Sequence, residues 1–380
     1  MTGEPGPRMM SAGPGQGVAF RVATRDEFDA WDDLTVHIGG GHVYQSRAWA
    51  AHRARAGWQP DYLIGSDGSA VLALRRRWPI VGGSGAYLPR GPIPAGGAAA
   101  MAARLAGAAA WLGEHGVDVV ASDTEAAAAS GYPALAAAAG FRAIPELQPS
   151  RHRMSLDLGG SADEEALRAR FSKSTRQRLA AAERDGIEVV RYDRRGGPAD
   201  DLLTSAQDEA DPGTAFDRFA QRLLATGQRV GFRIGGVGEF QRWWASALAA
   251  GHLLFLEARV AGEPLGGLIL YRHGGRLSTV HSADDPASRS AHPGLMHLLR
   301  WRAIQLAVRE GCAEMDLGGV DIAPDHAQPV PGSPTWGLYE HKRSFGAEWV
   351  EMSGAHERVI RPWRYGLGRL TGRLARLARS

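Results

Sequence analysis

Cysteine is almost missing from this sequence. Cys312 is the single one among 380 residues, so no internal disulfide can form and a reducing compartment is expected. No stretch approaches the roughly 20 apolar residues that a membrane-spanning helix needs. The first 17 residues lack the apolar core of a signal peptide and predict a disordered lead. Together these absences predict a cytoplasmic protein.

Motifs for metals and cofactors are also missing. The sequence has no Walker loop, no H-E-x-x-H and no cluster of cysteine and histidine. The glycine-rich GPGQG at 13–17 follows no predicted strand, so it does not indicate a dinucleotide site. We therefore expect neither a metal ion nor a bound cofactor.

The composition is that of a globular protein with two domains. Hydrophobic residues make up 44% of the chain and charged residues 22%, and 380 residues exceed one ordinary domain. The formal net charge of +3 permits a polyanionic partner without requiring one.

Two parts of the chain repeat one order of predicted elements. In each, strand patterns are followed by a helix, a glycine and a further strand. The helices are predicted at 98–115 and 294–310, and Gly116 and Gly311 follow them. This order fits the acetyltransferase-like (GNAT) fold used twice, so we predict an α/β (α+β) chain with two tandem GNAT-like domains.

A densely basic stretch separates the two parts. Ser161 and Glu164 have the spacing of a capping box, and the predicted helix ends before Gly186. Its basic residues are Arg168, Arg170, Lys173, Arg176, Arg178 and Arg184. Either a solvated helix surface or contact with a polyanion explains such a run.

The most informative run is WGLYEHKRSFG at 336–346, where Lys342 stands between Tyr339 and Phe345, before a predicted strand. It resembles the C-terminal signature G-L-Y-x-F-K-x-x-F-G of the FemAB family of tRNA-dependent peptidyl aminoacyltransferases. His341 replaces a phenylalanine of that signature. Further fragments, including YLPRGPI and MDLGGVD, occur in the family's order between about residues 44 and 362.

The resemblance implies an aminoacyltransferase of cell-wall synthesis. It would move glycine, alanine or serine from aminoacyl-tRNA to the stem-peptide amine of a peptidoglycan precursor, either lipid II or UDP-MurNAc-pentapeptide. Such chemistry needs positioning and cations rather than a triad or a metal, because the ester is already activated.

Site residues also follow from the resemblance. Lys342, Tyr339 and His281 are the candidate catalytic residues, with Lys342 on the 3′-terminal phosphate or the ester carbonyl of the charged tRNA. The candidate substrate-binding residues are Arg53, Arg90, Asp123, Arg233, Phe240, Asp316 and Phe345.

Other roles stay open for several of these residues. The neighbouring Arg55 competes with Arg53 for the precursor phosphates, and His281 fits a packed core position equally well. Arg90 has the place of a turn residue paired with an acid. Asp316 either orients Lys342 or caps the turn that follows it.

The expected domains are 18–150, completed by 345–365, and 151–344, without a coiled-coil arm between 192 and 252. Residues 366–380 predict a basic amphipathic tail that either packs on its own domain or contacts the inner face of the cell membrane.

Two other activities remain possible. One is acyl transfer from acyl-CoA, although the segment around Gly294 lacks the second small residue of a CoA loop. The other is tRNA-dependent aminoacyl transfer in antibiotic biosynthesis.

Overall fold

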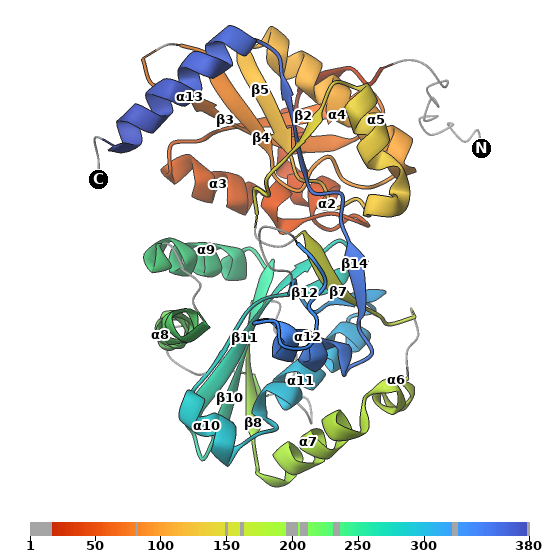
Figure 1. Ribbon diagram of the computed structural model, residues 1–380, viewed down its shortest axis with the longest axis vertical. Coiled ribbons are helices and arrows are strands. Elements are labelled where there is room, and N and C mark those ends of the chain that lie inside the picture. The colour runs from red at the N-terminus through yellow and green to blue at the C-terminus, as the bar shows by residue number, and fades with distance from the viewer. Residues whose placement is uncertain are drawn as a thin grey trace, which may run out of the picture. The chain divides into compact units, whose positions relative to one another are not determined.

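The computed structural model describes residues 17–80, 82–148, 151–159, 163–194, 204–205, 212–230, 236–320 and 326–377. The chain forms two compact units (Figure 1). Unit 1 contains Met1–Thr35, Gly57–Pro145 and Ser353–Ser380, and unit 2 contains Val36–Ala56 and Glu146–Met352. None of the described helices combines the length and the apolar character that crossing a bilayer requires.

Unit 1 is built on a seven-stranded sheet in the order β1-β2-β3-β4-β5-β15-β6. Its strands are β1 (Phe20–Val22), β2 (Gln59–Gly65), β3 (Ala70–Arg77), β4 (Ser84–Leu88), β5 (Val117–Ser122), β6 (Arg142–Ile144) and β15 (Ala355–Val359). Its helices are α1 (Arg25–Asp29), α2 (Trp31–Thr35), α4 (Gly97–Glu114), α5 (Tyr132–Ala138) and α13 (Pro362–Leu377). The alanine-rich α4 buries Leu105 and Leu112 in the core of this unit.

Unit 2 is built on an eight-stranded sheet in the order β14-β7-β13-β12-β11-β10-β8-β9. Its strands are β7 (His152–Asp157), β8 (Glu188–Asp193), β9 (Thr204–Ser205), β10 (Leu253–Val260), β11 (Glu263–His273), β12 (Arg276–Asp284), β13 (Glu314–Asp316) and β14 (Glu348–Glu351). Its helices are α3 (Arg47–Arg55), α6 (Glu164–Arg170), α7 (Lys173–Arg184), α8 (Pro212–Val230), α9 (Val237–Ala249), α10 (Pro286–Ala291), α11 (Leu295–Arg309) and α12 (Trp336–Arg343).

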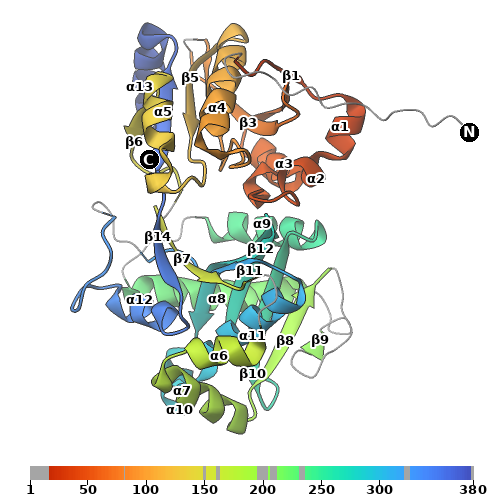
Figure 2. The ribbon, with the colours of Figure 1, turned by 90° about the vertical axis from the view of Figure 1, so that its right-hand side faces the viewer.

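Helices cover both faces of the unit 2 sheet (Figures 1 and 2). Successive side chains of a strand point to opposite faces. On β10, Leu254 and Leu256 therefore join the core formed with α7 and α11, while Phe255 packs against Phe219 of α8. The sheet is buried on both sides, which explains the nearly continuous apolar runs of its central strands.

The two units share one strand order. In unit 1, β2, β3 and β4 are antiparallel neighbours, and β5 then pairs parallel to β4 after α4. In unit 2, β10, β11, β12 and β13 repeat this arrangement, with α11 as the connecting helix. This is the repeated order of elements that the sequence predicted.

The division of the chain differs from the expected one in two places. Residues 36–56 belong to unit 2 rather than to the first domain, because Trp49 of α3 packs edge-on against Trp243 of α9. Within the expected return segment 345–365, β14 pairs with β7 of unit 2, and only β15 joins the sheet of unit 1. Neither pairing leaves a local signal in the sequence.

The basic stretch forms two helices instead of one. Phe171 is extended and ends α6, and the Ser172 side chain caps α7 by accepting from the Thr175 amide. The predicted cap Ser161 lies outside the described residues, and Asp163 caps α6.

Candidate functional site

Strand β12 of unit 2 continues past the end of its shorter parallel neighbour β13. Their parallel pairing covers three positions and ends at Ser278 and Asp316. Strand β12 continues beside β11, with a bulge at Val280, whereas the chain after β13 follows β7, where the Leu317 amide donates to the Met154 carbonyl (2.8 Å). Residues 279–282 are therefore partly exposed in the middle of a buried sheet.

Lys342 lies at this point of separation. Its ammonium donates to the carbonyl oxygens of Gly318 and Gly319, at 2.9 Å each, although only 4% of the residue is exposed. Gly318 has φ +81°, and a Cβ atom there would lie 2.8 Å from the Thr279 carbonyl oxygen and 3.3 Å from Lys342 Nζ. The charge of Lys342 is thus held between the two diverging strands by backbone dipoles.

Asp316 shapes the turn that Lys342 contacts. Its Oδ1 accepts from the Gly318 amide at 2.7 Å, so its carboxylate fixes the turn whose carbonyls face the lysine. Of the two roles open to Asp316, the structure shows the cap of the turn.

Tyr339 and Phe345 belong to the hydrophobic core of unit 2. The Tyr339 hydroxyl meets the side-chain amide of Gln328, and the fully buried Phe345 packs edge-on against Phe171. Both residues therefore position α12 from inside the core.

His281 and Phe240 face each other near the separated strands. The rings of Phe240 on α9 and His281 on β12 form a T-shaped pair with centroids 5.4 Å apart. The centre of the Trp244 ring lies 5.6 Å from that of the same imidazole. Burial lowers the pKa of His281 to about 4, so its imidazole is neutral at neutral pH. Arg233, expected near Phe240, lies outside the described residues.

Arg53 belongs to an aromatic group of unit 2. Its guanidinium carbon lies 5.5 Å from the centre of the Trp49 ring, and Trp49 stacks on Tyr44 at 4.3 Å. Arg53 is half-buried whereas Arg55 is exposed. Stacking holds the Arg53 guanidinium in place, so the geometry favours Arg53 over Arg55 as the ordered cation of α3.

Arg90 and Asp123 pair with each other in unit 1. The Arg90 amide donates to Asp123 Oδ1 (2.7 Å) and the Tyr87 hydroxyl to Oδ2 (2.8 Å), with the Arg90 guanidinium 3.7 Å away. Burial raises the pKa of Asp123, and the neighbouring Arg90 opposes that rise. This cluster follows the ends of β4 and β5, which stay paired up to Leu88 and Ser122.

A buried basic cluster adjoins Lys342. Arg300 of α11 is 1% exposed, and its Nε donates to Nε2 of His341 on α12 (3.1 Å). His341 Nδ1 lies 3.2 Å from Nε2 of His297. No acceptor for Arg300 Nη1 exists among the described residues. In the sequence, Arg300 is one of three arginines of α11. Nothing in this pattern indicates that it pairs with His341.

Burial controls the charges in this cluster. It lowers the pKa of Arg300 to about 10, which keeps the guanidinium charged. Burial, reinforced by Arg178 and Arg300, lowers the pKa of His297 to about 4, and burial beside Arg300 lowers the pKa of His341 well below its usual value. Both histidines are therefore neutral next to one buried cation, with His341 accepting from Arg300 at Nε2 and donating from Nδ1 to His297 Nε2.

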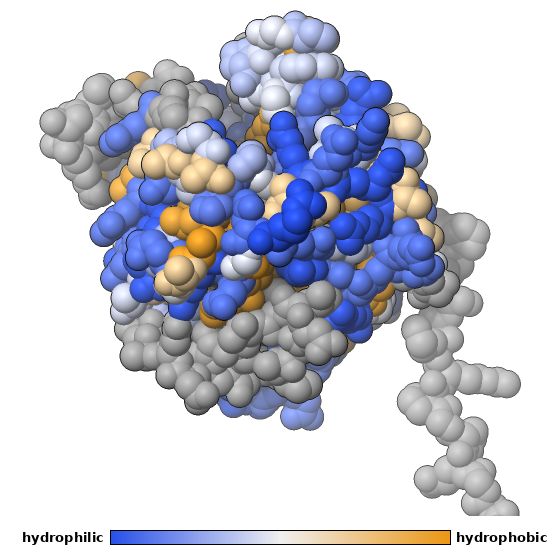
Figure 3. All heavy atoms as spheres, turned by 90° about the horizontal axis from the view of Figure 1, so that it is seen from below, coloured by the Kyte–Doolittle hydropathy of each residue, from blue (hydrophilic) through white to orange (hydrophobic). Residues whose placement is uncertain are grey.

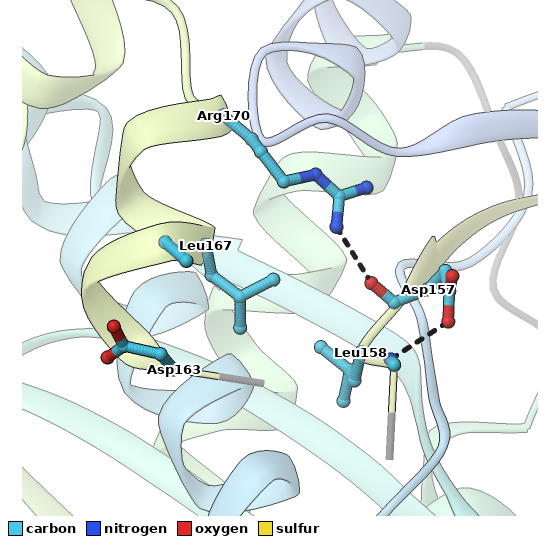
Figure 4. Close-up of a pocket in the computed structure, with 7 residues that line it drawn as sticks. Asp157, Leu158, Asp163, Leu167 and Arg170 are labelled. Carbon is cyan, nitrogen blue, oxygen red and sulfur yellow. Dashed lines mark hydrogen bonds between the residues drawn. The ribbon is translucent and has the colours of Figure 1, made fainter. Parts of the chain in front are cut away.

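The basic residues of α6 and α7 divide into two groups. Arg168 pairs with Glu183, and Arg176 donates to backbone carbonyls. Figure 4 shows Arg170 turned toward β7 beside a small pocket, with its Nη1 donating to the Asp157 carbonyl at 3.1 Å. The side chains of these three arginines therefore make contacts within unit 2.

The remaining basic residues, Lys173, Arg178 and Arg184, are exposed. The helix that carries them begins beside α12, because the Thr175 hydroxyl donates to the Ser344 hydroxyl (2.7 Å). Hydrophilic side chains cover most of the surface seen in Figure 3, on the side of α7 and α10.

The described residues hold no group of three or more histidine, cysteine, aspartate or glutamate side chains that could bind a metal ion. Cys312 is buried.

Comparisons with known proteins agree with this architecture. The family model of the acetyltransferase (GNAT) domain matches residues 169–343, which include β12, β13 and Lys342. The crystal structure of FemX superposes with a TM-score of 0.71 at 16% identity, covering 92% of this chain and 99% of that chain. L-PGS from Bacillus licheniformis gives 0.51 at 12% identity, covering 92% and 97%. No curated protein matches the sequence.

These matches confirm the predicted fold, an α/β chain with two GNAT-like domains and the architecture of FemX. The domain match also confirms the prediction of an acyltransferase-type enzyme. At such low identities the solved structures establish the fold alone, and the substrates are argued below.

We predict that replacing His341 by phenylalanine, the residue of the FemAB signature, destabilises this chain. The change leaves the buried Arg300 Nε without its acceptor, which lowers the free energy of unfolding by about 1–3 kcal/mol. Urea unfolding of H341F, R300M and the double variant measures it. The double variant should recover most of the loss, and strictly additive losses would contradict the coupling.

Acidification should also destabilise the chain. His281 and His297 have folded pKa values of about 4, below the value near 6.5 of an unfolded histidine. The unfolded chain therefore binds more protons, and their contribution to stability, complete above about pH 6.5, is lost as the pH falls toward 4. Urea unfolding across this range should show a smaller decline for H297L than for the unmodified chain. Equal slopes would refute the assignment.

Proposed function

We propose that this protein transfers an amino acid from aminoacyl-tRNA to the stem-peptide amine of a peptidoglycan precursor. The observation that carries the proposal is the buried ammonium of Lys342 at the separation of β12 and β13. A fixed cation there suits an activated ester, whose aminolysis needs positioning and stabilisation of developing negative charge. The FemX-like fold supports the same proposal.

The proposed reaction proceeds without a covalent enzyme intermediate. The acceptor amine attacks the ester carbonyl carbon, a C–N bond forms, and the bond to the ribose oxygen of the tRNA breaks. The amine loses one proton and the released ribose hydroxyl gains one. Lys342 stabilises either the oxyanion or the adjacent 3′-terminal phosphate by its charge. Tyr339 and Phe345 position α12, and the neutral His281 lies on β12 beyond its last pairing with β13.

The exposed cations of α7 fit the tRNA donor. Lys173, Arg178 and Arg184 lie on the helix that is hydrogen-bonded to the segment following Lys342. Lysine and arginine neutralise phosphates regardless of base sequence. The amino acid carried by the tRNA would be glycine, alanine or serine, and the reaction would take place in the cytoplasm.

We assign Arg53 to the phosphates of the precursor. Its guanidinium is held by the Trp49 ring and can bind a phosphate with two parallel hydrogen bonds. Lipid II and UDP-MurNAc-pentapeptide both carry a diphosphate, so either serves as acceptor in this proposal.

Acyl-CoA is the weaker donor candidate. GNAT enzymes that use CoA need free amides at a helix N-terminus for the pyrophosphate. Here that turn is buried: a Cβ atom on Gly294 would lie 2.3 Å from the Arg178 carbonyl oxygen of α7. The close approach of α7 argues against a pyrophosphate at this turn. Transfer to an antibiotic precursor uses the same chemistry and differs in the acceptor alone.

The proposal is tested by the mass of the product. Purified protein is mixed with either precursor and a mixture of charged tRNAs, or with acetyl-CoA in a separate reaction. We expect the precursor to gain the mass of one amino-acid residue, and RNase to prevent it. K342M should lower the rate by about 10²–10³-fold, because the cation next to the developing charge is lost.

Lys173→Met provides the comparison, since Lys173 and Lys342 are the two lysines of the chain and Lys173 is exposed on α7. It should raise KM for aminoacyl-tRNA and leave kcat nearly unchanged, because it removes one phosphate contact away from the reacting ester. A gain of an acetyl group would establish the CoA mode instead, and full activity of folded K342M would remove Lys342 from the mechanism. No gain with any donor would redirect the search to another acceptor amine.

Arg53 and Arg55 provide a second test, on the acceptor side. Arg53→Ala should raise KM for the precursor roughly 10-fold or more, because a charged hydrogen-bond pair to phosphate is lost, with a smaller change in kcat. Arg55→Ala, one exposed position further along α3, should change KM little. Steady-state kinetics with varied precursor measure both, and the reverse order of effects would reassign the phosphate contact to Arg55.

A further inference from the structure

Helix α13 presents an apolar stripe to solvent. Trp363, Leu367 and Leu370 are 65%, 44% and 56% exposed. Their spacing of four and three residues places them on one side of the helix. The sequence continues this spacing with leucines at 374 and 377. We call the three described residues the α13 stripe.

The opposite side of α13 is fastened to unit 1. Arg361 Nη1 donates to the Val117 carbonyl (3.0 Å), and the Tyr365 hydroxyl donates to Glu357 Oε2 (3.0 Å). Gly368 is buried so closely that a Cβ atom would lie 2.5 Å from the Trp78 ring. These contacts fix the rotation of the helix, so the α13 stripe has to point away from unit 1.

Charge of one sign surrounds the stripe. From Arg358 to Ser380 the sequence contains seven arginines and neither aspartate nor glutamate. Arg369 is exposed, and the Arg364 guanidinium carbon lies 5.1 Å from the Trp363 ring centre. An apolar strip edged by arginine, with tryptophan at its end, is the composition of helices that lie in a membrane interface.

We propose that the α13 stripe docks on the surface of an anionic lipid membrane. A second copy of the chain fits less well, because it would bring arginine-rich helices together, and stable protein interfaces bury about 800 Å² on each partner. Lipid phosphates instead supply the missing negative charge. The proposal concerns binding and stands independently of the proposed transfer chemistry.

The test is sedimentation of the full chain with vesicles of phosphatidylcholine alone or mixed equally with phosphatidylglycerol. We expect binding to the mixed vesicles that weakens with salt, since each arginine near an anionic surface contributes about five-fold in partitioning. W363S/L367S/L370S should lose at least about 10-fold in binding, and R369Q about five-fold. Leu135→Ser, which alters an exposed leucine of α5, should bind like the unmodified chain.

Circular dichroism checks that each variant is folded, and aminoacyl transfer with a soluble precursor should be unchanged by the triple substitution. Unchanged vesicle binding by the folded triple variant would overturn the proposal. So would a concentration-dependent dimer, seen by analytical ultracentrifugation and abolished by the same substitution, if vesicles do not bind. If the unmodified chain binds the vesicles but transfers no amino acid, that result would count against the proposed function alone.

Discussion

The separation of β12 from β13 is the constraint on which the candidate site depends. Just beyond β13, the Lys342 ammonium donates to the carbonyl oxygens of Gly318 and Gly319, and the Gly318 carbonyl also accepts from the Met154 amide of β7. An unpaired charge would be unfavourable at 4% exposure, so the lysine and the open strands stabilise each other. At the corresponding place of unit 1, β4 and β5 stay paired and Asp123 ties down the following loop. The same strand order therefore leaves β12 without β13 as a partner beyond three positions in unit 2, whereas β4 and β5 stay paired in unit 1.

The identity of the cation matters as much as its position. The chain contains 44 lysines and arginines, of which Lys173 and Lys342 alone are lysines, so arginine is its general choice. A guanidinium is planar and presents a rigid fork of donors, whereas an ammonium is a compact charge with three donors. Two carbonyl oxygens on successive residues, both 2.9 Å from one nitrogen, suit the ammonium. An arginine at 342 would have to displace the turn that Asp316 caps.

The sequence predicted those features that local patterns determine. The helix-glycine-strand repeat predicted α4 with β5 and α11 with β13 within one or two residues, and the resemblance to the FemAB signature singled out Lys342. It did not predict that Val36–Ala56 joins unit 2, because that depends on the contact of Trp49 with Trp243 across some 190 positions. The sequence did not predict the separation of β12 from β13 for the same reason, because strand register follows from pairing between distant segments.

His341 shows why a departure from a family signature is a poor guide to lost function. A signature treats this position alone, but the environment of residue 341 is set by Arg300 and His297 on another helix. A buried arginine next to phenylalanine would lack an acceptor for Nε, and a buried histidine without the arginine would lack its donor. Each residue is acceptable only with the other. In this chain the two positions form a hydrogen-bonded pair, and Lys342 on the same helix as His341 reaches the Gly318 and Gly319 carbonyl oxygens.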